Sequence, residues 1–223
     1  VHIAVVEGKT VTLKRATGYT GSAVLHVGSC ATLILGDGSM TQTPTGETAN
    51  GEALSDYETT QRGGELILDG GAVWEQGSAF TQGNSFANSN GTQAIFFDLT
   101  EGEDYGKQFI YHNSGVSAST SLVWNQGNLS IWDGVTLQNN AKHSANGSAI
   151  NSTAGVLTMY GGSITRCAAA ANADSGQGAV YVGTPDANSS TWMTKPDPDT
   201  ATFNMYGGTI KSNESSKRVE SDS

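Results

Sequence analysis

Carboxylates gather in two stretches of the 223-residue sequence. One group comprises Asp98, Glu101, Glu103 and Asp104, and the other comprises Asp186, Asp197 and Asp199. Glycoside hydrolysis needs two carboxyls about 5 to 10 Å apart on opposite sides of a bond, and calcium needs several oxygen ligands around one point. Sequence spacing supplies neither geometry, so a solvated acidic loop is the simplest interpretation of both groups. We therefore assign no catalytic residue, and the second group provides only weak calcium candidates.

Aromatic residues recur just before a glycine-containing turn, at Trp132, Tyr160 and Tyr206. If the three segments stack, these side chains form one outward column, with Gly36 and Asp69 at the equivalent positions of earlier segments. Aromatic rows bind sugars, yet rings stacked at the spacing between strands expose mainly their edges. The column is thus either a structural ladder or a ligand-binding row. Trp192, in a long insertion, is a further candidate ligand contact, or a plug over an outer sheet.

The two cysteines, Cys30 and Cys167, are expected to be free and mostly buried. In the expected register they lie about four strand steps, or roughly 19 Å, apart, which is beyond disulfide reach. No zinc site is predicted, because the sequence lacks a Cys-x-x-Cys pair and its four histidines have no ligand-like spacing. No metal and no cofactor are assigned.

Composition narrows the class of protein. The chain has 29 glycines and a formal net charge of −10, which favours short strands and turns and disfavours binding to nucleic acid or to anionic membrane surfaces. No apolar run approaches 18 residues, so membrane insertion is not expected. We expect residues 1–223 to form a single domain, as a piece of a longer surface protein.

Five segments repeat one pattern, in which two apolar residues alternate with an outward residue and a glycine turn follows. They are LILGDGSM from Leu33, LILDGGAV from Leu66, LSIWDGVTL from Leu129, LTMYGGSI from Leu157 and FNMYGGTI from Phe203, with a weaker copy, VTLKRA, from Val11. Stacking the copies predicts three inward columns: Leu33, Leu66, Leu129, Leu157 and Phe203; Leu35, Leu68, Ile131, Met159 and Met205; and Met40, Val73, Leu137, Ile164 and Ile210.

Other features follow from the same stacking. The glycine pairs at 70–71, 161–162 and 207–208 are expected at corners that require positive φ. Like polar positions, Asn140, Cys167 and Asn213, are expected at another corner, where amides can hydrogen-bond along the stack. Insertions are expected near 41–62, 98–108 and 185–200. The run 95–97 is a candidate wall, and 41–62 a candidate cover over an outward strip of Ile34 and Ile67.

These repeats, the glycine corners, and the phrases VEGKTVTLKRA (6–16) and GSCATLILGDGSM (28–40) resemble the pectin-lyase-like repeats of large surface proteins from Gram-positive, often gut-dwelling, bacteria. The resemblance implies an all-β, right-handed parallel β-helix of about six to eight rungs with loop insertions. Members of this group include polysaccharide lyases, glycoside hydrolases and non-catalytic adhesins, so the fold leaves the activity open.

The family's catalytic arrays are not found intact. Polygalacturonase-like members carry paired aspartates, a His-Gly and an Arg-x-Lys, and pectate-lyase-like members carry a calcium-binding aspartate group with a basic residue nearby. We therefore expect a non-catalytic module of a secreted or cell-wall-attached protein, an adhesin or stalk that contacts glycans or a host surface and other domains of its parent. A carbohydrate-active enzyme and a purely structural spacer are the alternatives.

Overall fold

The computed structural model describes residues 1–15, 23–47, 53–71, 73–76, 93–97, 108–112, 121–142, 147–171, 178–183, 201–211 and 213–217. Within these ranges the chain is all-β, with strands and no helix, and most of its sheets are parallel. Of the insertions expected near 98–108 and 185–200, residues 98–107 and 185–200 lie outside the described residues, and Gln108 begins a strand. Asp98, Glu101, Glu103, Asp104, Asp186, Trp192, Asp197 and Asp199 lie outside them as well.

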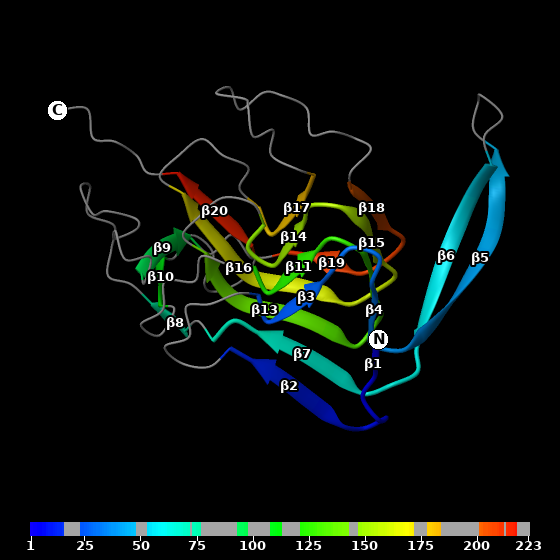
Figure 1. Ribbon diagram of the computed structural model, residues 1–223, viewed down its shortest axis with the longest axis horizontal. Coiled ribbons are helices and arrows are strands. Elements are labelled where there is room, and N and C mark those ends of the chain that lie inside the picture. Colours follow the sequence, from blue (N-terminus) through cyan, green and yellow to red (C-terminus); the bar gives the residue numbers. More distant parts are fainter. Residues whose placement is uncertain are drawn as a thin grey trace.

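Three parallel sheets, here named sheets A, B and C, form the body of the described structure (Figure 1). Sheet A contains, in spatial order, β1 (His2–Ile3), β4 (Thr32–Leu35), β12 (Asn128–Ile131), β15 (Gly155–Met159) and β18 (Ala201–Met205). Sheet B contains β2 (Thr10–Lys14), β7 (Glu65–Asp69), β13 (Val135–Lys142), β16 (Ser163–Ala171) and β19 (Thr209–Ile210), and β20 (Glu214–Lys217) also pairs with β16. Sheet C contains β3 (Leu25–Val27), β11 (Val123–Asn125), β14 (Ile150–Ser152) and β17 (Val180–Val182).

The chain visits these sheets in a fixed order. From β3 onward each pass contributes a strand to sheet C, then to sheet A, then to sheet B, and the next pass pairs alongside it. The first pass, in the described residues, supplies β1 to sheet A and β2 to sheet B. Because consecutive passes are hydrogen-bonded in parallel, residues one pass apart become neighbours across a sheet.

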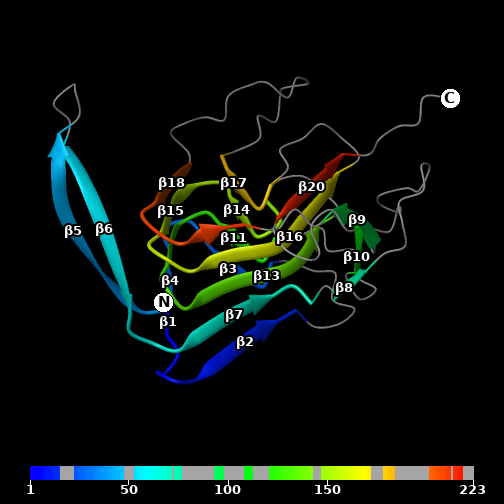
Figure 2. The same cartoon turned by 180° about the vertical axis from the view of Figure 1, so that it is seen from behind.

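Two antiparallel units interrupt the passes. Strands β5 (Gly38–Glu47) and β6 (Ala53–Gln61) form a hairpin between β4 and β7. Strands β8 (Val73–Gln76), β10 (Gln108–His112) and β9 (Gln93–Phe97) form a small sheet between β7 and β11. The views from both sides place the hairpin at one side of the parallel sheets and the small sheet at the other (Figures 1 and 2).

The core consists of apolar columns between the sheets, and the expected register is confirmed for most of sheet A. Leu33, Leu129, Leu157 and Phe203 are successive partners, as are Leu35, Ile131, Met159 and Met205. Most of the inner members of these columns are fully buried. Alternation of one inward and one outward residue produces this pattern, because side chains of a strand point to opposite faces.

Two columns require correction, because the segment at Leu66 belongs to sheet B. Leu66 pairs with Val11 and Val135 rather than with Leu33 and Leu129. Leu68 likewise pairs with Leu13 and Leu137, and the column then continues through Ile164 to Ile210. The two segments have similar sequences because both strands place alternate residues in the same core. The strand of LILGDGSM is β4 of sheet A, however, and the strand of LILDGGAV is β7 of sheet B. Outward Ile34 and Ile67 therefore lie on different sheets, and the predicted strip of these two side chains is wrong.

The third predicted column is also wrong at its early members. Met40 lies in the hairpin opposite Thr59, and Val73 lies in β8 opposite His112. The run 95–97 lies in β9, which is antiparallel to β10, so it is not a wall of the parallel body. The described residues accordingly give five strands along the main path of sheets A and B, fewer than the expected six to eight rungs.

The glycine pairs 161–162 and 207–208 occupy corners between sheets A and B, as expected, whereas the pair 70–71 follows β7 of sheet B and leads to β8, so it is not an equivalent corner. Gly162 has φ +78°, and a Cβ there would lie 2.6 Å from the carbonyl oxygen of Val135 in the neighbouring pass. Gly208, the equivalent residue one pass later, has φ +86°. A side chain at Gly162 would therefore meet both conformational and steric resistance.

The predicted polar corner forms within β13 and β16 of sheet B, past the residues of β13 that pair with β7. Asn140 pairs with Cys167, and the amide oxygen of Asn213 accepts a hydrogen bond from the backbone N–H of Cys167 at 2.9 Å. Asn139 and Arg166 precede the two paired residues, with φ of 55° and 51°. The corner thus turns through left-handed residues and satisfies backbone groups with side-chain amides.

Candidate functional site

The predicted aromatic column exists, at the corner where sheet A leads into sheet B. The ring centroids of Trp132 and Tyr160 lie 4.2 Å apart with planes 16° from parallel, and those of Tyr160 and Tyr206 lie 5.5 Å apart with planes 12° from parallel. Gly36 stands next to Trp132, as expected, because a Cβ on Gly36 would lie 3.3 Å from the Cβ of Trp132. The stacked rings cover one another's faces.

The hairpin packs onto this aromatic column. Tyr57 of β6 meets Tyr206 with centroids 4.8 Å apart and an interplanar angle of 53°. A Cβ on Gly38, at the start of β5, would lie 2.7 Å from Cε3 of Trp132. Both ends of the column are therefore in contact with the hairpin, which favours a structural role for Trp132, Tyr160 and Tyr206 over a ligand-binding row.

Asp69 does not belong to that column, contrary to the expectation. It ends β7 in sheet B and is buried. Its carboxylate accepts hydrogen bonds from the backbone N–H of Gly71 at 2.6 Å, from Nε2 of Gln138 at 3.1 Å and from Nδ2 of Asn139 at 3.0 Å. Three donors around one carboxylate make this residue part of the turn that follows β7.

A second aromatic row lies on the outer face of sheet C and was not predicted. The central residues of its four strands are His26, Trp124, Asn151 and Tyr181, which are partners in register from β3 to β17. Their neighbours along each strand point inward, since Val27, Val123, Asn125, Ile150 and Ser152 are all buried. We call His26, Trp124, Asn151 and Tyr181, together with the flanking Gln126 and Thr153, the sheet C row.

Contacts within the sheet C row hold its side chains in place. The rings of His26 and Trp124 stack with centroids 4.4 Å apart and planes 8° from parallel. Trp124 donates from Nε1 to Oγ1 of Thr153 at 3.1 Å, and Nε2 of His26 lies 3.1 Å from Oε1 of Gln126. His26 is exposed and Trp124 is 37% exposed, so the row is accessible at this end.

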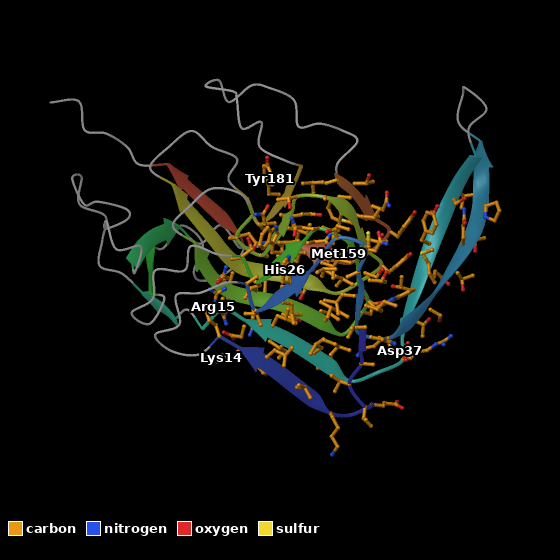
Figure 3. The ribbon with its side chains drawn as sticks, viewed as in Figure 1. Lys14, Arg15, His26, Asp37, Met159 and Tyr181 are labelled. Carbon is orange, nitrogen blue, oxygen red and sulfur yellow. The ribbon has the colours of Figure 1, made fainter. Side chains whose placement is uncertain are left out.

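The two ends of the sheet C row differ in exposure. Figure 3 labels His26 on β3 and Tyr181 on β17, the two edge strands of sheet C. Tyr181 is half-buried, and desolvation raises the pKa of its hydroxyl above the ordinary value. The phenol is therefore neutral at physiological pH and remains a hydrogen-bond donor.

The described strands of sheet C and their flanks carry no charged side chain of their own, and the nearest charge recorded against them is the buried guanidinium of Arg15, which donates to the carbonyl oxygen of Ser121 at 3.2 Å. The stretches 23–28, 121–127, 147–154 and 178–183 contain no Asp, Glu, Lys or Arg, although the whole chain has 21 acidic residues. A face with aromatic edges, amides and hydroxyls but no formal charge suits a neutral ligand that presents C–H groups and hydroxyls.

The sheet C row escaped the sequence analysis because its strands are only three residues long. LHV, VWN, INS and VYV share too little to be recognised as copies. One signal in the sequence could have found them. Val123, Ile150 and Val180 each begin a triplet of an apolar, an outward and a small residue, and successive triplets are separated by about one repeat period.

The cysteines are both free, as predicted, but their burial differs. Cys167 is buried, and desolvation raises the pKa of its thiol from 9.0 to about 12. Cys30 is exposed, contrary to the expectation, because it lies in a turn with φ 64° ahead of β4. Cys30 lies just before β4 and Cys167 lies in β16 two passes later, since only the pass of β11, β12 and β13 separates their passes. The expected four steps are therefore too many.

Among the described residues, no group of three or more His, Cys, Asp and Glu side chains is placed to hold a metal ion. The described ranges also contain no helix long and apolar enough to cross a membrane.

Comparison with known proteins gives no relative. No family model, no curated protein and no solved structure matches the chain. A function for this chain therefore has to be inferred from the arrangement of sheets A, B and C and from the contacts of the sheet C row.

Proposed function

We propose that the chain is a right-handed parallel β-helix module of an extracellular bacterial protein that binds glycans without cleaving them. The fixed order of sheets C, A and B and the apolar columns along sheets A and B support the β-helix. Right-handedness is supported by the strong preference of parallel crossover connections for that hand. The extracellular, surface-attached setting is supported by the acidic, glycine-rich composition and by the repeat resemblance.

The sheet C row is the observation that carries glycan binding. Sugar rings place C–H groups against aromatic side chains, while hydroxyls exchange hydrogen bonds with amides and side-chain hydroxyls. His26 and Trp124 cover each other's facing sides, so the surface they offer a sugar is the exposed ring edges and the side of His26 that faces away from Trp124 on the edge strand β3. Gln126 and Thr153 flank the pair with polar groups. Because the row bears no formal charge, we propose a neutral glycan that lies across the strands of sheet C.

Binding is tested by a glycan array followed by titration calorimetry on the best neutral oligosaccharide. Trp124→Ala should weaken binding about tenfold, which corresponds to roughly 1.4 kcal/mol and is within the range for one aromatic contact. Tyr160→Ala is the matched control, because it removes an aromatic residue from the column covered by the hairpin, and it should leave the affinity unchanged.

The glycan array, together with a polysaccharide-degradation assay, decides between this proposal and its alternatives. Release of reducing sugar or of an unsaturated product would identify an enzyme and overturn non-catalytic binding. If the array shows no binding while circular dichroism shows that the protein is folded, the result would favour the structural spacer. Equal losses of affinity for Trp124→Ala and Tyr160→Ala would show that the binding site is not on sheet C.

A further inference from the structure

Two tyrosine rings join the hairpin to the parallel sheets. Tyr57 lies on β6, and Tyr206 follows β18 at the corner where sheet A leads into sheet B. Their ring centroids are 4.8 Å apart with planes 53° from parallel, which is contact distance for aromatic side chains. The two phenols therefore meet although they are far apart in the chain.

The tilt between these two rings distinguishes them from the stacked pair beside them. At 53° the rings of Tyr57 and Tyr206 do not lie face to face, so an edge of one ring meets the other. Tyr160 and Tyr206 are instead stacked, with centroids 5.5 Å apart and planes 12° from parallel. A carbon–carbon bond between two phenols lies in the plane of each ring, so it forms at ring edges and not between stacked faces. Tyr57 is therefore the partner placed to couple with Tyr206.

Contacts around the pair hold both rings in position. A Cβ on Gly207 would lie 3.9 Å from Cγ2 of Thr59, so β6 meets this corner a second time. The ring of Tyr206 also rests on that of Tyr160. Two reactive groups held together in this way react as one molecule rather than through chance encounter, and the gain in rate can be large.

The charges around Tyr57 favour a cationic reagent. Tyr57 is half-buried, and its neighbours along β6, Asp56 and Glu58, are both exposed. Strands β5 and β6 contain no Lys or Arg, and the whole chain has a formal net charge of −10. A surface of one sign raises the local concentration of small ions of the opposite sign. A cationic oxidant should therefore reach this side of the pair readily.

We propose that Tyr57 and Tyr206 form a site of oxidative cross-linking, at which a one-electron oxidant joins the two rings as dityrosine. Each phenol loses one electron to the oxidant and its hydroxyl proton to water, which gives two phenoxyl radicals. The radicals form a carbon–carbon bond between the positions ortho to their oxygens. Each ring then transfers the hydrogen of the bonded carbon to its oxygen and becomes a phenol again. In total the pair loses two hydrogen atoms, as two protons and two electrons.

The cross-link would fix the hairpin to the parallel sheets by a covalent bond. A two-stranded hairpin is only marginally stable by itself, so its strands open more easily than those of the body. Bonding Tyr57 to Tyr206 removes the openings in which β6 leaves the corner. The proposal does not rest on glycan binding, because the sheet C row takes no part in it.

The test exposes the full chain to photogenerated tris(bipyridyl)ruthenium(III), a cationic one-electron oxidant. Wild-type protein should yield a monomer that has lost two hydrogen atoms and shows dityrosine fluorescence, and tandem mass spectrometry should place the link between Tyr57 and Tyr206. Tyr57→Phe and Tyr206→Phe keep the rings but lack the phenol, so each should lower the yield at least about tenfold. Tyr160→Phe is the matched control and should keep the wild-type yield.

Circular dichroism shows whether each variant is folded. No dityrosine in folded wild-type protein, or a yield that rises with protein concentration because copies couple to one another, would overturn the proposal. An intramolecular link that persists in folded Tyr57→Phe protein, or that folded Tyr160→Phe protein lacks, would assign the coupling to other tyrosines and overturn it too. In the cross-linked monomer, amides of β5 and β6 should exchange with solvent several-fold more slowly than before oxidation, and unchanged exchange would contradict the fixing of the hairpin.

Discussion

At the scale of single residues, identical side chains acquire different properties from their place in the columns. Cys167 is fully buried within β16 of sheet B, whereas Cys30 is exposed in a turn. Burial disfavours the thiolate and raises the pKa of Cys167 to about 12. The reactive form of a thiol is the thiolate, so the two cysteines should differ in chemistry.

We predict that a thiol reagent modifies one cysteine of the folded chain at neutral pH, and that Cys30→Ser abolishes this reaction until the protein is unfolded. The comparison of native and urea-unfolded samples by mass spectrometry checks it. Rapid modification of folded Cys30→Ser protein would show that Cys167 is accessible.

The same thiol makes stability depend on pH. The folded pKa of Cys167 lies above its unfolded value, so its contribution is fully present below about pH 9 and is lost as pH rises toward 12. The free energy of unfolding of Cys30→Ser, measured with urea, should therefore fall as pH rises through this window, relative to that of the Cys30→Ser, Cys167→Ala double variant. Parallel pH profiles for the two variants would contradict the expectation.

At the scale of elements, the hairpin β5–β6 depends on the aromatic column for its position. An isolated two-stranded hairpin is only marginally stable in water, and this one has Tyr57 in contact with Tyr206. A Cβ on Gly38 would be 2.9 Å from the carbonyl oxygen of Thr60 and 2.7 Å from Trp132, so the base of the hairpin is tightly packed. The aromatic column therefore anchors the hairpin to the parallel sheets.

We predict that Tyr57→Ala frees the hairpin while the parallel sheets stay folded. The lost ring contact is worth about 0.5 to 1.5 kcal/mol, so amides of β5 and β6 should exchange with solvent several-fold faster. Hydrogen exchange read by mass spectrometry measures this. Glu58→Ala is the matched control, because Glu58 is the exposed next residue on β6. Equal exchange in the two variants would mean that Tyr57 does not anchor the hairpin.

At the scale of the whole molecule, stability should decrease from the middle of the parallel sheets toward both ends. Leu129 and Leu157, on the inner strands β12 and β15, are fully buried, whereas end residues such as Val11 and Met205 are exposed. Within the described residues each inner strand of sheet A pairs with two strands and each edge strand with one, so the edge strands have fewer contacts to lose on opening.

We predict that native-state hydrogen exchange finds the highest opening free energies in β12 and β15 and the lowest in β1 and β18. Free energies of opening range widely within one protein, and strands with fewer buried contacts open first. Uniform protection across sheet A would indicate a single cooperative unit instead.

Much of the fold was predictable from the sequence because its signals are local. Alternation of inward and outward residues in LSIWDGVTL, LTMYGGSI and FNMYGGTI, with a glycine turn after each, predicts strands, corners and the register of Leu129, Leu157 and Phe203. The 28-residue spacing from Leu129 to Leu157 contains no described insertion, so neighbours in sequence period are neighbours in space. The column of Trp132, Tyr160 and Tyr206 follows from that same spacing.

Only the tertiary structure decided which strands adjoin across the long interval between Leu35 and Leu122. Leu66 and Leu33 have similar sequences, and either sheet could accept either strand, because both sheets line one apolar core. The choice depends on how the intervening hairpin and the small antiparallel sheet leave the body, and no local pattern records that path. The sheet C row was hidden for a related reason. A three-residue strand has only one outward residue, and the row forms only when passes far apart in the chain place His26 against Trp124.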